Sequence, residues 1–207
     1  KYFETFFSKP RFIAFNTKAE KKLVSEICNK EFRSNDIVGI GFDFHDEIVT
    51  NSEDYLLYIG RIRKEKNCDL LFAYYLSLPN SLREKYPLIL AGQSNMEIPV
   101  DKSIIHLGYV SEFKKRQLLS KCKVLINPSI YESLSMVVIE AWTYFKPVLV
   151  NKNSQVLRDH ILESNGGMYF DSEKSFHDGI NYLTDPRNDS ITTNFGINGN
   201  RYAQKYN

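Results

Sequence analysis

Two carboxylates, Glu132 and Glu140, stand eight positions apart in the otherwise mostly apolar segment YESLSMVVIEAW. The preceding KVLINPS predicts a strand that runs into a turn at Pro128, after which Ser133 or Ser135 can cap a helix. Glu132 then lies in the loop, and Glu140 lies on the helix that follows. The two carboxylates are therefore expected on one continuous unit of strand, loop and helix.

The predicted helix MVVIEAWTYF is apolar on nearly every side, which indicates burial on several faces. A buried ionised carboxylate without a partner is costly, so Glu140 must meet a cation, hydrogen-bond donors or a ligand. Two helical turns, about 11 Å, separate it from the loop, so both carboxylates can contact one extended ligand. The alternative is a structural ion pair for Glu140 and a second helix cap for Glu132.

The segment IGRIRKEKNCD places Gly60, Arg61 and Lys66 around the start of another predicted helix. Cations are unfavourable there by themselves, because the amino end of a helix carries about half a positive charge. An anion bound between them would reverse that sign. The segment therefore indicates an anion site, and the alternative is that its two cations are surface residues paired with Glu65 or Asp69.

From residue 55 onward, short apolar runs alternate with longer segments of helical periodicity. Strands are predicted at residues 55–59, 87–91, 103–107, 123–127, 147–151 and 167–170. Helices are predicted at residues 66–78, 111–121, 135–145, 154–163 and 173–184. This alternation is typical of a parallel sheet covered by helices on both faces. The sequence thus predicts an α/β fold, a Rossmann-like domain that binds ligands at the carboxyl ends of its strands.

Composition narrows the class of protein. The 207 residues are 43% apolar and 25% charged, which suffices for one substantial core, and the net charge of +2 does not favour nucleic-acid binding. Cys28, Cys68 and Cys122 are widely spaced and odd in number, so no disulfide framework is expected and a reducing compartment follows. No apolar run reaches the roughly 20 residues of a membrane span, and no signal peptide opens the chain. A soluble, cytoplasmic protein is expected.

Both ends of the chain are expected to lie outside the predicted sheet. Residues 1–45 offer one amphipathic helix (TKAEKKLVSEICNK) and one strand-like run (DIVGIGFDF), which is too little to close a sheet. An aromatic cluster precedes them, formed by Tyr2, Phe3, Phe6 and Phe7. Residues 46–190 hold the Rossmann-like domain. The tail at residues 191–207, rich in Asn and Gly, is expected to form a loop and a last short crossover helix.

Other kinds of site find no support in the spacing of residues. Neither a GxGxxG loop nor a Walker loop follows the first strand of the domain, and the only G-x-G, Gly39 and Gly41, lacks its third glycine. G-x-S-x-G is missing, so no nucleophile elbow is expected. Structural or surface roles are expected for the histidines, which lack metal-ligand spacing: His45, His106, His160 and His177.

The string NPSIYESLSMVVIEA resembles the P-S-x-x-E-x-F-G-x-x-x-x-E-A signature of retaining nucleotide-sugar glycosyltransferases of the glycogen-synthase-like family 4 class. YIGRIRKEKN is similar to the G-R-x-x-x-x-K-G/N segment of that family, LILAGQS to its strand ending in glycine, IIHLGYV to its F-x-G-x-V strand, and VGIGFD to its P-N-G-V-D linker. In that family two Rossmann-like domains face each other across a cleft in a GT-B fold, and the second binds the sugar-nucleotide donor. The resemblance implies that this chain is the second domain, preceded by a remnant of the first domain and the interdomain linker.

The resemblance also implies roles for individual residues. Arg61 and Lys66 would bind the donor diphosphate, Glu140 the ribose hydroxyls and Glu132 the hydroxyls of the transferred sugar. Backbone amides of residues 133–136 would add to the phosphate site. Tyr109 and Val110, which follow the third predicted strand, would lie near the base. The expected catalytic residues are Glu132, Arg61 and Lys66. The expected donor-binding residues are Gly60, Arg61, Lys66, Tyr109, Val110, Glu132, Ser133, Leu134, Ser135, Met136 and Glu140.

This set of residues suits the departure of a nucleoside diphosphate, which builds negative charge on phosphate oxygens. Cations and a helix dipole can stabilise that charge without a metal. No Asp-x-Asp motif occurs in the sequence, and neither a metal nor another cofactor is expected. Three departures from the family pattern stand out: Ser135 replaces a usual glycine, YFKPV replaces G-x-P-V, and VGIGFD lacks the proline and asparagine of the linker.

The leading hypothesis is the donor-binding half of a retaining glycosyltransferase, a hexosyltransferase type, acting in glycan biosynthesis. Its partners would be a nucleotide-sugar donor and a glycan, lipid or other acceptor held by the missing first domain, which would also supply any peripheral membrane association. By itself the chain is expected to bind donor weakly and to transfer nothing. Two alternatives remain, a sugar-nucleotide epimerase of the same architecture and a non-catalytic nucleotide-binding module.

Overall fold

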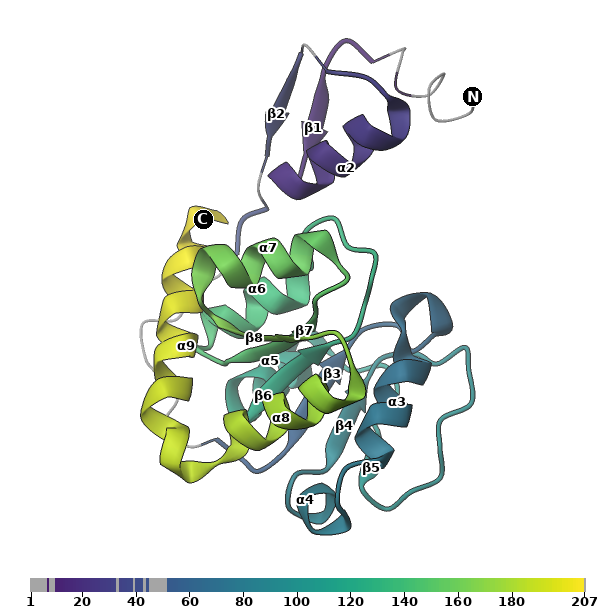
Figure 1. The fold of residues 1–207 in the computed structure, drawn as a ribbon, viewed down its shortest axis with the longest axis vertical. Helices are drawn as coiled ribbons and strands as arrows, with labels where there is room; N and C mark the ends of the chain where they lie inside the picture. Colours follow the sequence, from purple (N-terminus) through teal and green to yellow (C-terminus); the bar gives the residue numbers. More distant parts are fainter. Residues whose placement is uncertain are drawn as a thin grey trace.

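The structure, a computed structural model, describes residues 7, 10–32, 34–38, 40–42, 44 and 52–206. Its larger part is a six-stranded parallel sheet with the strand order β5-β4-β3-β6-β7-β8 (Figure 1). The strands are β3 Leu56–Ile59, β4 Leu88–Ala91, β5 Ile104–His106, β6 Val124–Asn127, β7 Val148–Asn151 and β8 Gly167–Phe170. Every residue of β6 and β7 is buried, which explains why these runs are apolar on both faces. The prediction of a parallel α/β sheet is confirmed.

Helices follow the strands in the predicted alternation. They are η1 Lys64–Lys66, α3 Cys68–Leu76, α4 Asn80–Lys85, α5 Glu112–Lys121, α6 Met136–Thr143, α7 Gln155–Ser164, α8 Glu173–Thr184, η2 Pro186–Asn188, α9 Asp189–Ala203 and η3 Gln204–Tyr206. Three of them begin at a serine whose side chain accepts a hydrogen bond from the first turn, namely Ser111, Ser154 and Ser172. The five predicted helices are confirmed, and α4 was not predicted.

Each face of the sheet has its own apolar core. On one face, α5, α6 and α7 pack against side chains such as Leu57, Leu125 and Val148. On the other face, α3 and α8 cover Leu56, Leu88 and other apolar residues of the sheet. The three cysteines are buried free thiols. Burial on both faces leaves the strand ends and the loops that follow them as the place where polar chemistry can be built.

The prediction of a loop in the C-terminal tail is wrong, because residues 189–203 form the 15-residue helix α9. This helix runs along the side of the sheet and packs against α6 (Figure 1). Its glycines allow the backbone of α9 to approach α6 closely. A Cβ at Gly196 would lie 1.9 Å from the carbonyl oxygen of Phe145, and one at Gly199 would lie 2.1 Å from the Trp142 ring. The glycines that favour a loop in the sequence therefore allow two helices to touch.

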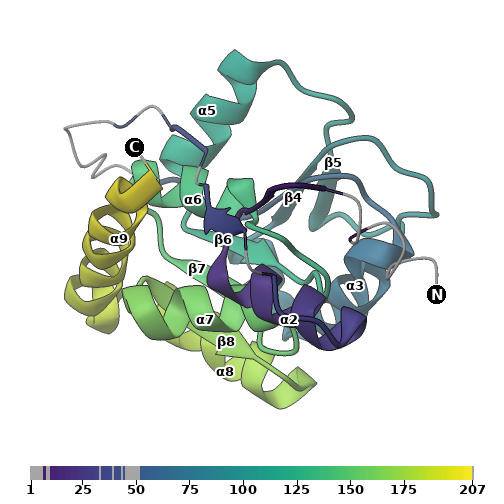
Figure 2. The ribbon, with the colours of Figure 1, turned by 90° about the horizontal axis from the view of Figure 1, so that it is seen from above.

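Residues before the sheet form a small unit of their own, with β1 Ile13–Phe15, α2 Lys18–Cys28 and β2 Asn35–Ile37. The predicted helix is confirmed, β1 was missed, and the strand predicted in DIVGIGFDF is limited to a two-stranded parallel pair with β1. Phe7 packs on Phe32, and the rest of the predicted aromatic cluster lies outside the described residues. Seen from above, α2 lies beside α7, which it contacts (Figure 2).

Within the described residues, no helix has the length and apolar character needed to cross a membrane.

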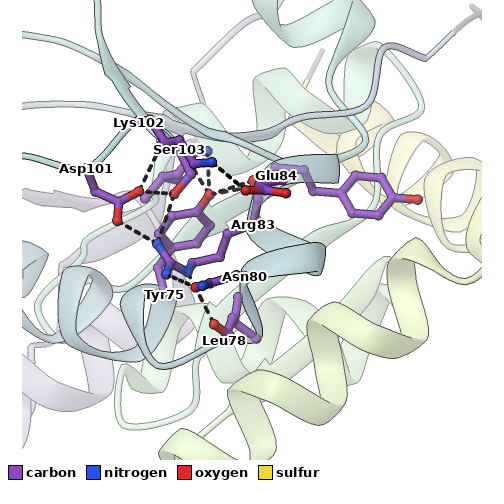
Figure 3. A network of polar contacts seen from close by, with 10 residues as sticks. Tyr75, Leu78, Asn80, Arg83, Glu84, Asp101, Lys102 and Ser103 are labelled. Atoms are coloured by element: carbon purple, nitrogen blue, oxygen red, sulfur yellow. Dashed lines mark hydrogen bonds and ion pairs between the residues drawn. The ribbon is translucent and has the colours of Figure 1, made fainter.

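A polar network fastens α4 to the connection between β4 and β5 (Figure 3). Arg83 donates to a carboxylate oxygen of Asp101 at 2.7 Å and to Ser103 Oγ at 3.2 Å. The backbone N–H of Ser103 donates to Asp101, and the buried Tyr75 hydroxyl donates to the Ser103 carbonyl. Hydrogen bonds from Ser103 and Arg83 lower the pKa of Asp101 to about 2. The network is distant from the strand ends that carry the site, so its role is structural.

The α6–α9 contact makes a first prediction. Gly199→Ala should lower the free energy of unfolding by about 1–3 kcal/mol, because the added methyl group overlaps the fully buried Trp142 and outweighs the gain in helix propensity. Urea denaturation measures the change. Asn194→Ala, at an exposed position of the same helix, is the matched control and should be neutral or slightly stabilising. Equal stability of Gly199→Ala and the unchanged chain would contradict the close contact.

Asp101 provides a pH-dependent prediction. Its pKa is lower in the folded chain than in the unfolded one, so its contribution to stability is present above about pH 4 and is lost as the pH falls through about 2. Asp101→Asn should therefore destabilise the chain at pH 7, and the difference should shrink as the pH approaches 2. Denaturation curves across this range test it. Asp178→Asn, an exposed change on α8, should give no comparable pH-dependent difference.

Candidate functional site

A cavity of about 320 Å³ opens at the carboxyl ends of β3 and β6. These two strands are neighbours at the point where the strand order reverses, since the chain proceeds outward from β3 to β5 and returns to β6. Crevices at such switch points are where open α/β sheets bind ligands. Seven of the predicted site residues line this cavity: Gly60, Lys66, Glu132, Ser133, Leu134, Ser135 and Met136. Asn16 and Ile40 border it from the N-terminal unit.

An ion pair lies at the wall of this cavity. Lys66 Nζ is 2.8 Å from Glu132 Oε1, and the two side chains are 26% and 12% exposed. Lys66 ends the short helix η1 after β3, whereas Glu132 belongs to the loop between β6 and α6. The fold therefore brings together, from two strand ends, the cation and the carboxylate that the sequence singled out separately.

The β6–α6 loop, residues 128–135, is held by three asparagine side chains. Asn67 and Asn151 both donate to the carbonyl oxygen of Pro128, at 3.1 and 3.0 Å. Asn127, the last residue of β6, donates to Ser135 Oγ at 2.8 Å and accepts from the N–H of Ser129 at 3.0 Å. Both ends of the loop are thus fixed by buried or half-buried hydrogen bonds.

Two further side chains hold the middle of the same loop. The Thr17 hydroxyl, at the start of α2, donates to the carbonyl oxygen of Ser133 at 2.9 Å. His160 on α7 lies with Nε2 2.8 Å from the carbonyl oxygen of Leu134 and Nδ1 3.0 Å from the Tyr202 hydroxyl. Burial lowers the pKa of His160, so the imidazole is neutral at pH 7. Because a carbonyl can only accept, Nε2 carries the proton and Nδ1 accepts from Tyr202.

Ser135 begins α6 in a left-handed conformation with φ 63° and ψ 70°. This is the backbone region where the related signature has glycine, so the serine occupies a glycine-like conformation. Ser135 is the N-cap residue of α6, one of the two serines predicted for that position, but its Oγ accepts from Asn127 and makes no cap hydrogen bond. Within the described part of the chain, the amides of residues 133–137 make no hydrogen bond. They line the cavity as free donors at the positive end of a helix, a suitable place for an anion.

A second cavity, of about 180 Å³, adjoins the first at Met136 and is lined by Glu140. Glu140 Oε1 is 2.8 Å from Lys115 Nζ on α5, and the same ammonium is 3.0 Å from Glu112. Burial disfavours the charged form of Lys115, but its hydrogen bonds to the two carboxylates outweigh that effect and raise its pKa. Glu140 is therefore paired while still facing open space, so both an ion pair and a ligand contact fit its position.

Three predicted site residues are outside the lining of both cavities. Arg61 is exposed directly after β3, and its carbonyl oxygen accepts from the Tyr58 hydroxyl. Tyr109 is 80% exposed, and Val110 packs against the core under α5 and α6. Arg61 follows Gly60, which lines the larger cavity, whereas Tyr109 and Val110 lie between β5 and α5.

The histidines occupy separate places. His106 contacts the carbonyl oxygen of Gly92, His177 contacts that of Tyr74, and His160 is buried. His45 and Gly39 lie outside the described residues. Among the described residues, no three His, Cys, Asp or Glu side chains are grouped so that they could hold a metal ion.

Sequence reasoning missed several residues that shape the site, namely Thr17, Asn67, Lys115, Asn127, Asn151 and His160. A signal existed for two of them. Asn127 and Asn151 each end a strand that is otherwise apolar, and both are buried. A buried amide at a strand end must find partners, so these positions indicate a loop that needs to be held. The others act across long sequence separations and leave no local pattern.

Free backbone amides, an ion pair and a second carboxylate lie around cavities at a switch point, an arrangement suited to an anionic ligand in an α/β domain. Residues 42–200 match the glycosyl transferases group 1, and the chain belongs to that family. It is a glycosyltransferase domain, as the sequence resemblance predicted.

Individual relatives agree with the family assignment. Over 107 residues, 47% of the chain, it is 31% identical to O-antigen chain mannosyltransferase B of Escherichia coli, of which this segment covers 28%. Over 112 residues it is 31% identical to an α-1,4-N-acetyl-D-galactosaminyltransferase of Campylobacter jejuni, covering 50% of the chain and 31% of that enzyme. Anabaena HepE in complex with UDP-glucose has a similar fold, with a TM-score of 0.76 at 14% identity over 94% of this chain and 59% of HepE. The chain therefore spans less than two thirds of the length of each of these relatives.

The Lys66–Glu132 pair makes a prediction about stability. Lys66→Met leaves a mostly buried carboxylate without its cation and should lower the free energy of unfolding by about 1–3 kcal/mol. Adding Glu132→Gln should restore much of that loss. Urea denaturation of both single variants and the double variant gives the coupling energy. The exposed pair Lys102–Glu84, treated in the same way, should show much weaker coupling, because solvent screens it. Equal coupling in the two pairs would contradict a special role for the buried one.

Proposed function

We propose that the chain is the donor-binding domain of a retaining, metal-independent glycosyltransferase, which moves a sugar from a nucleoside-diphosphate sugar to a glycan or lipid acceptor. The observation that carries the proposal is the continuous unit of β6, loop and α6. It presents Glu132 and free amides to one cavity and Glu140 to the next. An extended ligand with a sugar, two phosphates and a ribose matches that order of groups.

The proposed placement follows the charges. The diphosphate lies at the amides of the β6–α6 loop and near Lys66, where the helix end and the ammonium both favour negative charge. Arg61, which is exposed next to Gly60, can extend toward the same phosphates. The transferred sugar lies at Glu132, and the ribose hydroxyls donate to Glu140 in the second cavity. Tyr109 and Val110 would approach the base from the strand ends before α5.

The chemistry of this arrangement concerns the leaving group. When the bond from the sugar to the diphosphate breaks, negative charge grows on the phosphate oxygens. Donors that are already oriented stabilise that charge more than they stabilise the bound substrate, which lowers the barrier. Lys66 and Arg61 act on the phosphates, while Glu132 holds the sugar in place through its hydroxyls. No metal enters this scheme.

Relatives suggest the classes of donor and acceptor. The solved HepE structure holds UDP-glucose, and the two enzymes above transfer mannose and N-acetylgalactosamine, as their names state. Uridine diphosphate sugars are therefore the first donors to test. Since the chain covers less than two thirds of these relatives, the acceptor site is assigned to a further domain, and this domain alone should not transfer sugar. A cytoplasmic location goes with the proposal, because buried free thiols suit a reducing compartment.

Calorimetric titration with UDP, GDP, ADP and their sugars tests the proposal. One nucleotide series should bind, and Lys66→Ala or Glu140→Gln should weaken that binding by about one to two decades, as expected for the loss of one charge-assisted contact. Lys174→Ala, an exposed change on α8, should leave the affinity unchanged.

Absence of binding by every nucleotide would leave the non-catalytic module as the better description. Release of free nucleotide and an altered sugar without any acceptor, by the full-length enzyme, would favour the epimerase instead.

A further inference from the structure

We propose that His160 and Thr17 are positioning residues that orient two peptide groups of the β6–α6 loop, so that the N–H groups of Leu134 and Ser135 point to the ligand's phosphates. This inference rests on the proposed function of the cavity. Neither residue lies in the segments that resemble the family signature, and neither was singled out by its spacing. Both side chains bond carbonyl oxygens of the loop.

The geometry of the peptide bond carries the first step. In a trans peptide the C=O of one residue and the N–H of the next point in opposite directions within one plane. Thr17 Oγ1 bonds the carbonyl oxygen of Ser133 at 2.9 Å, so the N–H of Leu134 faces away from Thr17. His160 Nε2 bonds the carbonyl oxygen of Leu134 at 2.8 Å, so the N–H of Ser135 faces away from His160. Fixing two carbonyls thus fixes the directions of two donors.

The N–H groups of Leu134 and Ser135 belong to residues that border the cavity, and neither has a partner within the described residues. Within the described residues, the N–H groups of Leu134 and Ser135 make no hydrogen bond, although both residues are nearly buried. An N–H group that has no partner in the protein is available to donate to a ligand. Both residues line the cavity of about 320 Å³. Successive N–H groups at a left-handed turn form the concave arrangement that binds anions, and Ser135 has that conformation.

His160 is itself held by neighbouring side chains. Its Nδ1 accepts from the Tyr202 hydroxyl, and the Tyr202 hydroxyl lies 3.5 Å from that of Tyr206. The rings of Trp142 and Tyr202 pack edge-on against the imidazole. Because Tyr202 supplies a proton to Nδ1, the proton of the neutral ring stays on Nε2, where it bonds the loop. The helix α9 therefore fixes both the tautomer and the orientation of the side chain that orients the loop.

A residue that orients the loop amides can be distinguished from one that only stabilises the fold. A residue that only stabilised the domain would affect all ligands of the site alike. A residue that directs amides to phosphates should affect ligands in proportion to their phosphate contacts. The discriminating quantity is therefore the ratio of the affinity for a nucleoside diphosphate to the affinity for the matching nucleoside.

The experiment measures this ratio by titrating the chain with UDP, GDP and ADP and with uridine, guanosine and adenosine. His160→Phe keeps the aromatic packing and removes both hydrogen bonds. We expect it to weaken diphosphate binding about tenfold and to leave nucleoside binding within about twofold. Thr17→Val should act in the same direction, and Thr17→Ser, which keeps the hydroxyl, should retain the native ratio. His177→Phe is the matched control, because that histidine bonds Tyr74 and Ser77 far from the loop.

A second measurement needs no variant. In amide NMR spectra of the unchanged chain, the Leu134 and Ser135 resonances should move downfield with the nucleoside diphosphate and stay in place with the nucleoside. If these resonances do not respond to a diphosphate that binds, or if His160→Phe and Thr17→Val keep the native ratio, the inference is overturned while the proposed function stands. If no diphosphate binds the unchanged chain, the proposed function fails and the inference falls with it.

Discussion

Four side chains hold the β6–α6 loop through its carbonyl oxygens. Asn67 and Asn151 donate to the first carbonyl of the loop, and Thr17 and His160 donate to two carbonyls near its end. Since the two sides of a peptide group face opposite ways, donors that bond the carbonyls leave the amides directed elsewhere. If protein acceptors bonded these amides instead, the amides could not donate to a ligand. The sheet, the two helix layers and the N-terminal unit together bring these four donors to one loop.

The two ion pairs keep the site stable without a ligand. Glu132 and Glu140 are mostly buried, and each would be unfavourable there without Lys66 or Lys115. A ligand that takes over one member of a pair leaves the other in need of a partner. Phosphate can engage the ammonium while sugar hydroxyls donate to the carboxylate, so a molecule that carries both groups satisfies both members. A free sugar or a free phosphate satisfies only one, which is a physical reason for such a site to favour a sugar nucleotide.

The sequence predicted the parts of the structure that local patterns determine. Apolar runs alternating with helical segments predicted the six strands and five helices. Expected burial singled out Glu140, the loop position singled out Glu132, and a cation near a helix start singled out Lys66. The error in the tail arose because glycine at a helix contact and glycine in a loop look alike in a sequence. The contacts of the asparagines, Thr17 and His160 with the loop were not predicted, for another reason. Thr17 and Ser133 are 116 positions apart, and their contact exists only once two separate units have packed.

The positions of Thr17 and His160 connect the loop to elements at both ends of the chain. Thr17 begins α2 in the N-terminal unit, and His160 is held by Tyr202 near the end of α9. Any shift of the N-terminal unit relative to the sheet must stretch the bond from Thr17 to Ser133, because the loop is fixed at Pro128 and Ser135 by residues of the sheet. The peptide would then rotate and carry its N–H with it. The direction of one donor in the loop thus depends on where the preceding unit sits, whereas the donor set by His160 depends on the packing of α7 against α9 and Trp142.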